Sequence, residues 1–260
     1  MTAISLKNDN RIREEWTPKF YFTDSGRILQ MNNTGFIEKA SLNNSWHIKF
    51  TLLLLTIFLA IASCIKAPGY AYEGGSLFLQ HLGTLVLLLP LALELRHPRL
   101  SVSACVCLFI FACIHILGAR YLYTYVPYDE WAKKLLNIDL NIKGDGVIHG
   151  NKYDRLVHLA FGLLMFPVVF QLAKRVVNGD NIFLTLLLAW LTIQTFSMVY
   201  EVFEWILSIV LSPKEAEEYN GQQGDMWDAQ KDMALALLGS TISAIYTCFF
   251  HRRKHDCPQA

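Results

Sequence analysis

Charged residues are scarce in this chain. Of its 260 residues only 17% are Asp, Glu, Lys or Arg, whereas 53% are hydrophobic, and the mean hydropathy is +0.30. A soluble domain usually has about a quarter charged residues and no more than about half apolar ones. Neither sign of charge dominates, since 23 basic residues stand against 22 acidic ones, which argues against nucleic-acid binding by bulk charge. This composition excludes an ordinary soluble domain, a disordered chain and a collagen-like chain.

The six cysteines lack the spacing of a disulfide framework or a zinc site. Five lie within apolar runs, where a cysteine is usually a buried small hydrophobic residue. Cys105 and Cys107 are separated by one residue, which is the wrong spacing for a redox or zinc pair. A cleavable signal peptide is also missing, because the cleavage-like segment Ile61–Cys64 follows the long polar segment Met1–Trp46. We therefore expect the first apolar run to be an uncleaved membrane anchor.

Long apolar runs dominate the chain after Trp46. A helix needs about 20 apolar residues to cross the hydrocarbon core of a bilayer. Pro90 and Pro167 fall inside two of the runs, and membrane helices tolerate proline. The sequence therefore predicts an all-α polytopic membrane helix bundle in residues 47–250, between a polar cytoplasmic segment (1–46) and a basic cytoplasmic tail (251–260). The six predicted spans are Ile48–Ile65, Leu77–Leu95, Val102–Tyr121, Leu156–Ala173, Ile182–Leu211 and Met233–Phe250.

The distribution of Lys and Arg predicts the orientation of these spans. If the amino terminus is inside, 14 of the 23 basic residues lie on the cytoplasmic side and nine lie on the other side. Cytoplasmic loops are enriched in Lys and Arg. We therefore expect a multi-pass protein of the inner (plasma) membrane with both termini in the cytoplasm and the two long polar loops outside. We also expect the segment Met1–Trp46 to be weakly ordered or peripheral and dispensable for insertion.

The fifth apolar run carries a polar stripe. Carboxylates inside a membrane helix are costly, so two of them on one helix face call for an explanation. They can be structural acids bonded to neighbouring helices, or they can serve acid/base chemistry, metal ligation or ion passage; we favour a functional role. The stripe recurs at spacings of three and four and consists of Gln194, Ser197, Glu201, Glu204 and Ser208.

Two other predicted spans begin with ionisable residues. Asp154 and His158 lie four residues apart and share a helix face, which alone is typical of a helix cap with an interfacial pair. Asp225, Asp228 and Asp232 are spaced three and four apart, so on a helix they would line one face. A solvated acidic helix start is the alternative, since the helix dipole favours acids there. Further along the same span, small residues such as Gly239 and Ser243 would permit close helix packing.

These polar groups all fall at one end of the predicted bundle. The third and fifth spans end where the second, fourth and sixth begin, whichever way the bundle is inserted. With a cytoplasmic amino terminus, this common depth is the outer part of the membrane. As catalytic candidates in one cluster we predict His158, Glu201, Glu204, Asp228 and Asp232. As substrate-binding candidates around them we predict His115, Arg120, Asp154, Arg155 and Asp225. Together such groups can share protons, hold a cation, or pair with Arg155 and Lys231.

Four motifs, in order along the chain, resemble those of the YjdF-like family of bacterial inner-membrane proteins, a domain of unknown function. They are His115 with Gly118, Arg120, Tyr121, Tyr123 and Pro127; Tyr153, Asp154 and Arg155 with His158 and Gly162; Tyr200, Glu201, Glu204 and Trp205; and Gln223, Gly224, Asp225, Trp227, Asp228, Gln230, Asp232 and Met233. The resemblance covers about His115 to Ala244, and it implies a multi-span helical fold without a settled activity. The order of charged residue and His, then Glu, then Asp before a glycine-containing helix is also similar to VanZ-like membrane proteins, which are associated with glycopeptide tolerance.

Three functions remain open from the sequence. The first is an enzyme-like site in which His and carboxylates do acid/base chemistry or hold a divalent metal, acting on an envelope or lipid-linked small molecule. It lacks a Ser or Cys nucleophile motif and a metal signature of known spacing. The second is a proton- or cation-coupled transporter, although an internal repeat is missing. The third is a structural membrane protein with a buried polar network. The expected partner is the lipid bilayer, without nucleic acid, and the cofactor is unknown apart from a candidate divalent cation.

Overall fold

The chain divides into two units, Met1–Trp46 and His47–Ala260, and each is described by itself. The computed structural model describes residues 20–22, 28–30, 40–69, 71, 76–138, 152–177, 181–213, 216, 219 and 225–256. In the first unit two short strands, β1 (Phe20–Phe22) and β2 (Ile28–Gln30), pair antiparallel. The order of most of this segment, like the end of the predicted basic tail at 257–260, lies outside the described residues.

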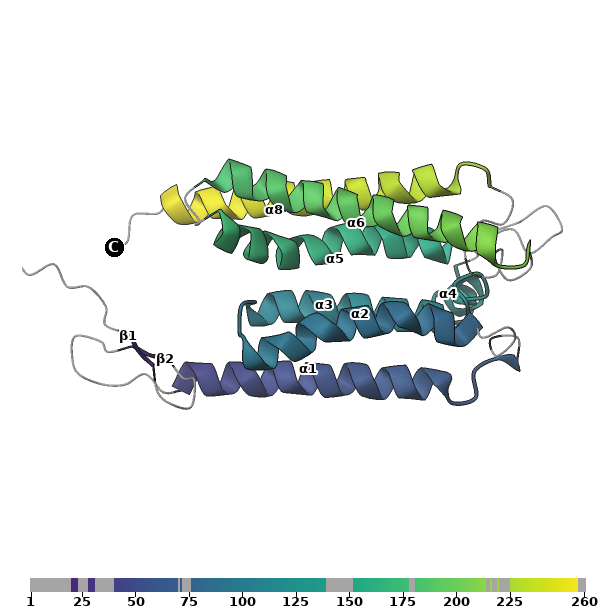
Figure 1. Cartoon of the computed structure of the whole chain (residues 1–260), viewed down its shortest axis with the longest axis horizontal. Coiled ribbons are helices and arrows are strands. Elements are labelled where there is room, and N and C mark those ends of the chain that lie inside the picture. The colour runs from purple at the N-terminus through teal and green to yellow at the C-terminus, as the bar shows by residue number, and fades with distance from the viewer. Residues whose placement is uncertain are drawn as a thin grey trace, which may run out of the picture. The chain divides into compact units, whose positions relative to one another are not determined.

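The second unit is built from helices (Figure 1). Among the described residues, six helices are long enough and apolar enough to cross a membrane, so the predicted all-α bundle with six membrane spans is confirmed. These helices are α1 (Ala40–Cys64), whose first residues belong to the first unit, α2 (Ser76–Arg96), α3 (Val102–Arg120), α5 (Tyr153–Val176), α6 (Ile182–Val210) and α8 (Asp228–Asp256). Ser101 and Asn181 begin α3 and α6 as N-caps, accepting the backbone N–H groups of Ala104 and Leu184. Pro90 and Pro167 lie inside α2 and α5 as expected.

Helix α5 packs against three other membrane helices, α3, α6 and α8, while α2 packs on α3. Figure 1 shows α5, α6 and α8 running side by side. Leu91, Leu108 and Val168 belong to one apolar cluster that joins α2, α3 and α5. Phe166 and Ile193 belong to a second cluster, which joins α5 to α6. The helices that carry the predicted catalytic candidates are therefore packed on one another.

Helix α6 buries only one narrow face. The rest of the helix exposes large apolar side chains such as Phe183, Phe196 and Trp205, as expected of a helix that faces lipid. The buried face is spaced every three or four residues and comprises Thr185, Ala189, Ile193, Ser197, Glu201 and Glu204. Part of the predicted polar stripe thus points into the bundle, whereas Ser208, its last member, is exposed.

Two helices begin earlier than their apolar runs. Helix α5 starts at Tyr153, so Asp154 and Arg155 lie in its first turn, and α8 starts at Asp228. The interpretation that Asp225 lines a helix face with the later acids is therefore wrong, because Asp225 precedes α8. Helix α4 (Tyr128–Leu136) was not predicted. Its nine residues lie in a connection that we expected to be a polar loop. Acids in its first turn and lysines in its last turn complement the helix dipole.

Candidate functional site

The N-terminal parts of α5 and α8 bring two carboxylates and a histidine together. One ligand atom each from Asp154, His158 and Asp232 lies within 4.8 Å of the other two. Within this group the Nε2 atom of His158 is 3.8 Å from Oδ1 of Asp154. His158 and Asp232 are buried, with exposed fractions of 6% and 1%. Groups of this kind inside a membrane protein need partners, protons or a bound cation.

Helix α6 adds two more carboxylates to this group. Oε1 of Glu201 lies 3.5 Å from Nε2 of His158, and both side chains are buried. Glu204, one turn further along α6, is hydrogen-bonded to Glu201 and to Tyr200. Glu204 also lies close enough to Asp154 and Asp232 for electrostatic repulsion between their carboxylates. We refer to Asp154, His158, Glu201, Glu204 and Asp232 as the carboxylate cluster.

Several oxygen atoms in and beside the carboxylate cluster are buried without a hydrogen-bond partner among the described residues. They are Oδ2 of Asp154, Oε1 of Glu201, Oδ1 of Asp232 and Oγ of Ser197. Leaving a buried polar atom unpaired costs about 1–3 kcal/mol, and more for a charged group. Four neighbouring carboxylates cannot all be ionised at this depth without a compensating cation. The cluster therefore has both the donor atoms and the electrostatic need for a cation or for shared protons.

Two basic residues lie at the edge of the cluster and hold Asp225. Oδ2 of Asp225 is 2.5 Å from Nη2 of Arg155 and 2.5 Å from Nζ of Lys231. The same Nη2 atom lies 3.3 Å from Oδ1 of Asp228, while Trp227 donates its backbone N–H to Oδ1 of Asp225 at 3.1 Å. The hydrogen bond from Lys231, followed by those from Trp227 and Arg155, lowers the pKa of Asp225 well below its usual range. Asp225 is therefore ionised at neutral pH and ties α5 to the start of α8.

Tyrosine side chains surround the cluster; Tyr123, Tyr153 and Tyr200 belong to the motifs quoted above without being site candidates, and Tyr219 belongs to none of them. The ring of Tyr200 lies 5.8 Å from that of His158, and its hydroxyl is hydrogen-bonded to Tyr219. Burial raises the pKa of Tyr219 to about 12, so its hydroxyl keeps its proton. Tyr153 packs its ring 6.2 Å from Tyr123 and donates its hydroxyl to the carbonyl of Ile114. The sequence did contain a signal for Tyr200, because this residue directly precedes Glu201, a member of the predicted polar stripe.

His115 lies in a separate pair. Its Nδ1 atom is hydrogen-bonded to the hydroxyl of Tyr123, and its Nε2 atom is buried without a partner among the described residues. Burial raises the pKa of Tyr123, so its hydroxyl keeps its proton and can donate to or accept from His115, depending on the tautomer of the imidazole. A Cβ atom added at Gly83 would lie 2.6 Å from the His115 ring, so α2 and α3 are in close contact here. His115 thus packs beneath α2.

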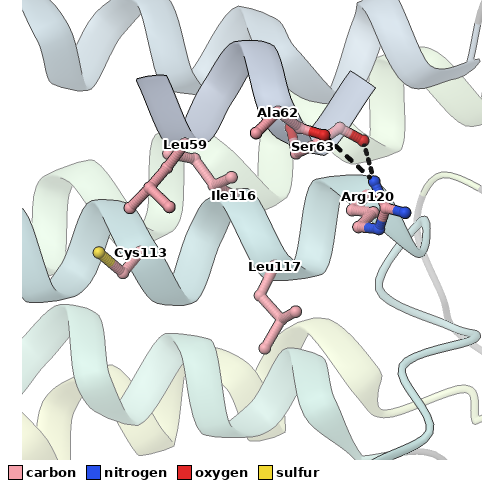
Figure 2. Close-up of a pocket in the computed structure, with 7 residues that line it drawn as sticks. All are labelled: Leu59, Ala62, Ser63, Cys113, Ile116, Leu117 and Arg120. Carbon is pink, nitrogen blue, oxygen red and sulfur yellow. Dashed lines mark hydrogen bonds between the residues drawn. The ribbon is translucent and has the colours of Figure 1, made fainter. Parts of the chain in front are cut away.

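Arg120 is engaged with the end of α1. Its guanidinium donates to the carbonyl of Ser63 at 2.6 Å and to that of Lys66 at 3.0 Å, and so caps the C-terminus of this helix. Figure 2 shows Arg120 bonded to Ser63 and Ala62 at the rim of a recess of about 430 Å³. The recess is lined by α1 and α3 through Leu59, Ala62, Ser63, Cys113, Ile116, Leu117 and Arg120. Arg120 is the one predicted site residue in this lining, and the carboxylate cluster has no member there.

The structure thus brings the five members of the carboxylate cluster together and joins Asp228 to them through Arg155. It places Arg155 and Asp225 at the edge of the cluster. His115 and Arg120 make their contacts with Tyr123 and with α1. Roles in substrate binding or catalysis stay predictions for all ten residues.

Comparison with known proteins gives a family and one curated relative. A family model described as "Predicted membrane protein (DUF2238)" matches residues 48–253. The chain is 29% identical over 170 residues to "Inner membrane protein YjdF" of Escherichia coli (strain K12), a match that covers 65% of this chain and 76% of the relative. No solved structure matches. The predicted YjdF-like membership is therefore confirmed, whereas the similarity to VanZ-like proteins stays an interpretation of the residues.

Proposed function

This chain belongs to the DUF2238 family of predicted membrane proteins and is a multi-pass protein of the inner membrane, and from its carboxylate cluster we propose that it is a metal-dependent membrane enzyme. In this proposal Asp154, His158 and Asp232 hold a divalent cation, and Glu201 and Glu204 exchange protons with the substrate. The substrate is an envelope or lipid-linked small molecule, because the cluster is buried between membrane-spanning helices.

The observation that carries this proposal is the donor set. Two carboxylate oxygens and one imidazole nitrogen within 4.8 Å of one another approach the separation of atoms that share one ion, since each ligand lies about 2.0–2.2 Å from Zn²⁺. A mixed oxygen and nitrogen set favours Zn²⁺ or Mn²⁺ over Ca²⁺, which prefers oxygen alone. The unpartnered oxygens of Asp154 and Asp232 supply the free lone pairs that a cation needs.

Three observations support Glu201 as the group that accepts a proton in this proposal. It is 3.5 Å from His158, it is 7% exposed, and its Oε1 atom has no hydrogen-bond partner among the described residues. Glu204 and Tyr200 bond to one another on the same helix and could pass a proton to or from Glu201. General acid/base groups need this proximity to the reacting atoms more than they need a particular residue type.

A proton- or cation-coupled transporter is the second candidate. It is favoured by the depth of the carboxylate cluster, because intramembrane acids and histidines commonly form ion and proton pathways. Purified protein reconstituted in liposomes would then carry a cation or proton flux that Glu204→Gln abolishes. A metal-dependent enzyme would show tight metal binding without such a flux.

Elemental analysis of detergent-purified protein tests the proposal. The wild type, loaded by dialysis against Mn²⁺ or Zn²⁺, should keep about one ion per chain. Asp232→Asn and His158→Gln should each lose most of it, and Glu204→Gln should keep it. Asp129→Asn, which removes an exposed carboxylate on α4, is the matched control and should match the wild type. Sub-stoichiometric metal in the loaded wild type, or equal retention in all variants of confirmed helicity, would overturn the proposal.

A further inference from the structure

The carboxylate of Asp225 lies among hydrogen-bond donors of the kind that form an anion-binding site. Its Oδ2 atom lies 2.5 Å from both Arg155 Nη2 and Lys231 Nζ, and its Oδ1 atom accepts the N–H of Trp227. Two cations and a backbone N–H at the start of a helix are the groups that proteins use to bind carboxylates and phosphates. Here the anion comes from the chain itself.

This anion site adjoins the carboxylate cluster. Arg155 directly follows Asp154, and its Nη2 atom also reaches Asp228, which lies one helical turn before Asp232. Nε of Arg155 is buried and has no hydrogen-bond partner among the described residues, so one donor of the guanidinium is not used. Arginine normally offers five donors in a planar fork, which matches the oxygens of a phosphate. Arg155 therefore has a donor that its contacts with Asp225 and Asp228 do not use.

The charges around Asp225 restrict the binding of a further anion there. Six carboxyl groups, those of Asp154, Glu201, Glu204, Asp225, Asp228 and Asp232, outnumber the basic side chains near them, which are Arg155, Lys231 and Lys152, the last of which acts on Asp228. A dianion entering this region would meet net repulsion unless a divalent cation were bound next to it. Anion binding at Arg155 should therefore depend on the metal.

We propose that Arg155, Lys231 and the Trp227 N–H bind a phosphate group of the substrate, and that Asp225 fills this site until the phosphate displaces it. The inference rests on the proposed metal site and names the substrate class, a phosphate-bearing molecule. A tetrahedral phosphate can contact Arg155, Lys231 and a neighbouring cation through separate oxygens, whereas Asp225 contacts both basic side chains through the same oxygen. Asp225 precedes α8, so its displacement leaves the helix intact.

Equilibrium dialysis of radiolabelled inorganic phosphate against detergent-purified, Mn²⁺-loaded protein tests the proposal. The wild type should bind phosphate only with the metal. Asp225→Asn should tighten binding at least tenfold, because the competing carboxylate is gone, and Arg155→Gln should weaken it at least tenfold. Lys134→Gln, on the exposed side of α4, is the control for loss of one positive charge and should have no effect. A parallel arm uses nanodiscs with and without phosphatidic acid.

The outcomes separate this inference from the metal site. Phosphate binding that phosphatidic acid in the nanodisc inhibits identifies a lipid phosphate, and binding that the lipid leaves unchanged identifies a free phosphate group; both support the proposal. If the protein holds its metal but neither form binds, or if Asp225→Asn changes nothing, the phosphate site is wrong while the metal site stands. If phosphate binds equally without metal, the coupling to the cation is wrong.

Discussion

Gly162 of α5 and Gly239 of α8 face each other across a backbone contact. A Cβ atom added to Gly162 would overlap the carbonyl oxygen of Ala236, and one added to Gly239 would overlap that of Leu159. Gly162 lies one turn after His158, and Gly239 lies about two turns after Asp232. This close approach sets the distance between the two helices that carry most of the carboxylate cluster.

Replacing Gly239 by leucine should therefore damage both the fold and the site. The new side chain has to push α8 away from α5, which costs about 1–3 kcal/mol or more for overpacking in a tight interface. We expect a lower Tm in detergent and less than half of the wild-type metal content. Gly69→Ala is the control, since nothing lies within 4 Å of a Cβ atom there. Retention of both Tm and metal by Gly239→Leu would show that the helix contact does not position the cluster.

The number and order of the membrane spans could be predicted because hydrocarbon thickness alone selects apolar runs of sufficient length. The apolar run of the fourth span begins only at Leu156, because Asp154 and Arg155 interrupt the apolar pattern, whereas α5 begins at Tyr153; the shared helix face of Asp154 and His158 was expected from their spacing. As a helical residue, Arg155 reaches the start of α8 and pairs with Asp225 and Asp228 at the edge of the cluster. A hydropathy pattern contains no information on such contacts between helices.

For the site, the sequence allowed us to predict only that its residues lie at a common depth in the membrane. Glu201 and His158 could be assigned to the same end of the bundle, but their 3.5 Å separation depends on how α5 and α6 pack. Arg120 has the same depth by sequence, yet its side chain turns to the carbonyls at the end of α1. Tyr219 lies in the connection between α6 and α8, where it is helical although no apolar periodicity of the sequence marks it, and it reaches the cluster through Tyr200.

A second prediction concerns the buried ion pair of Lys49 and Glu94 near the other end of the helices. Lys49 Nζ lies 2.9 Å from Oε2 of Glu94, both residues are buried, and Glu94 also accepts the backbone N–H groups of Arg99 and Leu100. Lys49→Met leaves a buried, uncompensated carboxylate and should cost about 3–5 kcal/mol of unfolding free energy. Thermal unfolding in detergent measures the loss. Lys49→Met combined with Glu94→Gln should recover part of it, and a double variant as unstable as the single one would contradict this account.

A third prediction concerns orientation. Lys49 was counted among the 14 cytoplasmic basic residues, but in the structure its charge is neutralised within the bundle by Glu94. The remaining bias still favours cytoplasmic termini. Reporters fused at each end should therefore read cytoplasmic, both in the wild type and in Lys49→Met. A carboxyl-terminal reporter that reads extracytoplasmic would place the carboxylate cluster at the inner face instead of the outer one.

A fourth prediction separates His115 from the metal site. Tyr123→Phe removes the hydroxyl that is hydrogen-bonded to Nδ1 of His115 and leaves this buried nitrogen unpaired, at a cost of about 1–3 kcal/mol. Gly83→Ala should destabilise by a different route, because its Cβ atom overlaps the His115 ring. Both variants should lower the Tm and keep the wild-type metal content. Loss of metal from folded Tyr123→Phe protein would mean that His115 belongs to the functional site.

The last prediction uses the pH dependence of Asp225. Hydrogen bonds from Lys231, Trp227 and Arg155 lower its pKa in the folded protein, whereas the unfolded chain should have the ordinary value of about 3.9. A lowered folded pKa means that the contribution to stability is fully present above the unfolded value and is lost as the pH falls through the folded value. The Tm difference between wild type and Asp225→Asn should therefore be constant from about pH 8 to pH 5 and should still be present at about pH 3. Taking the Tm difference between wild type and Asp225→Asn cancels the effect of titrating Asp228 and the carboxylate cluster, because both proteins contain these groups. The contribution should also shrink at high salt, because the Lys231 side chain is 46% exposed and its charge is screened. A Tm difference that is already gone at pH 4 would mean that Asp225 titrates normally and is not held by Arg155 and Lys231, and the anion site would then be open without displacement.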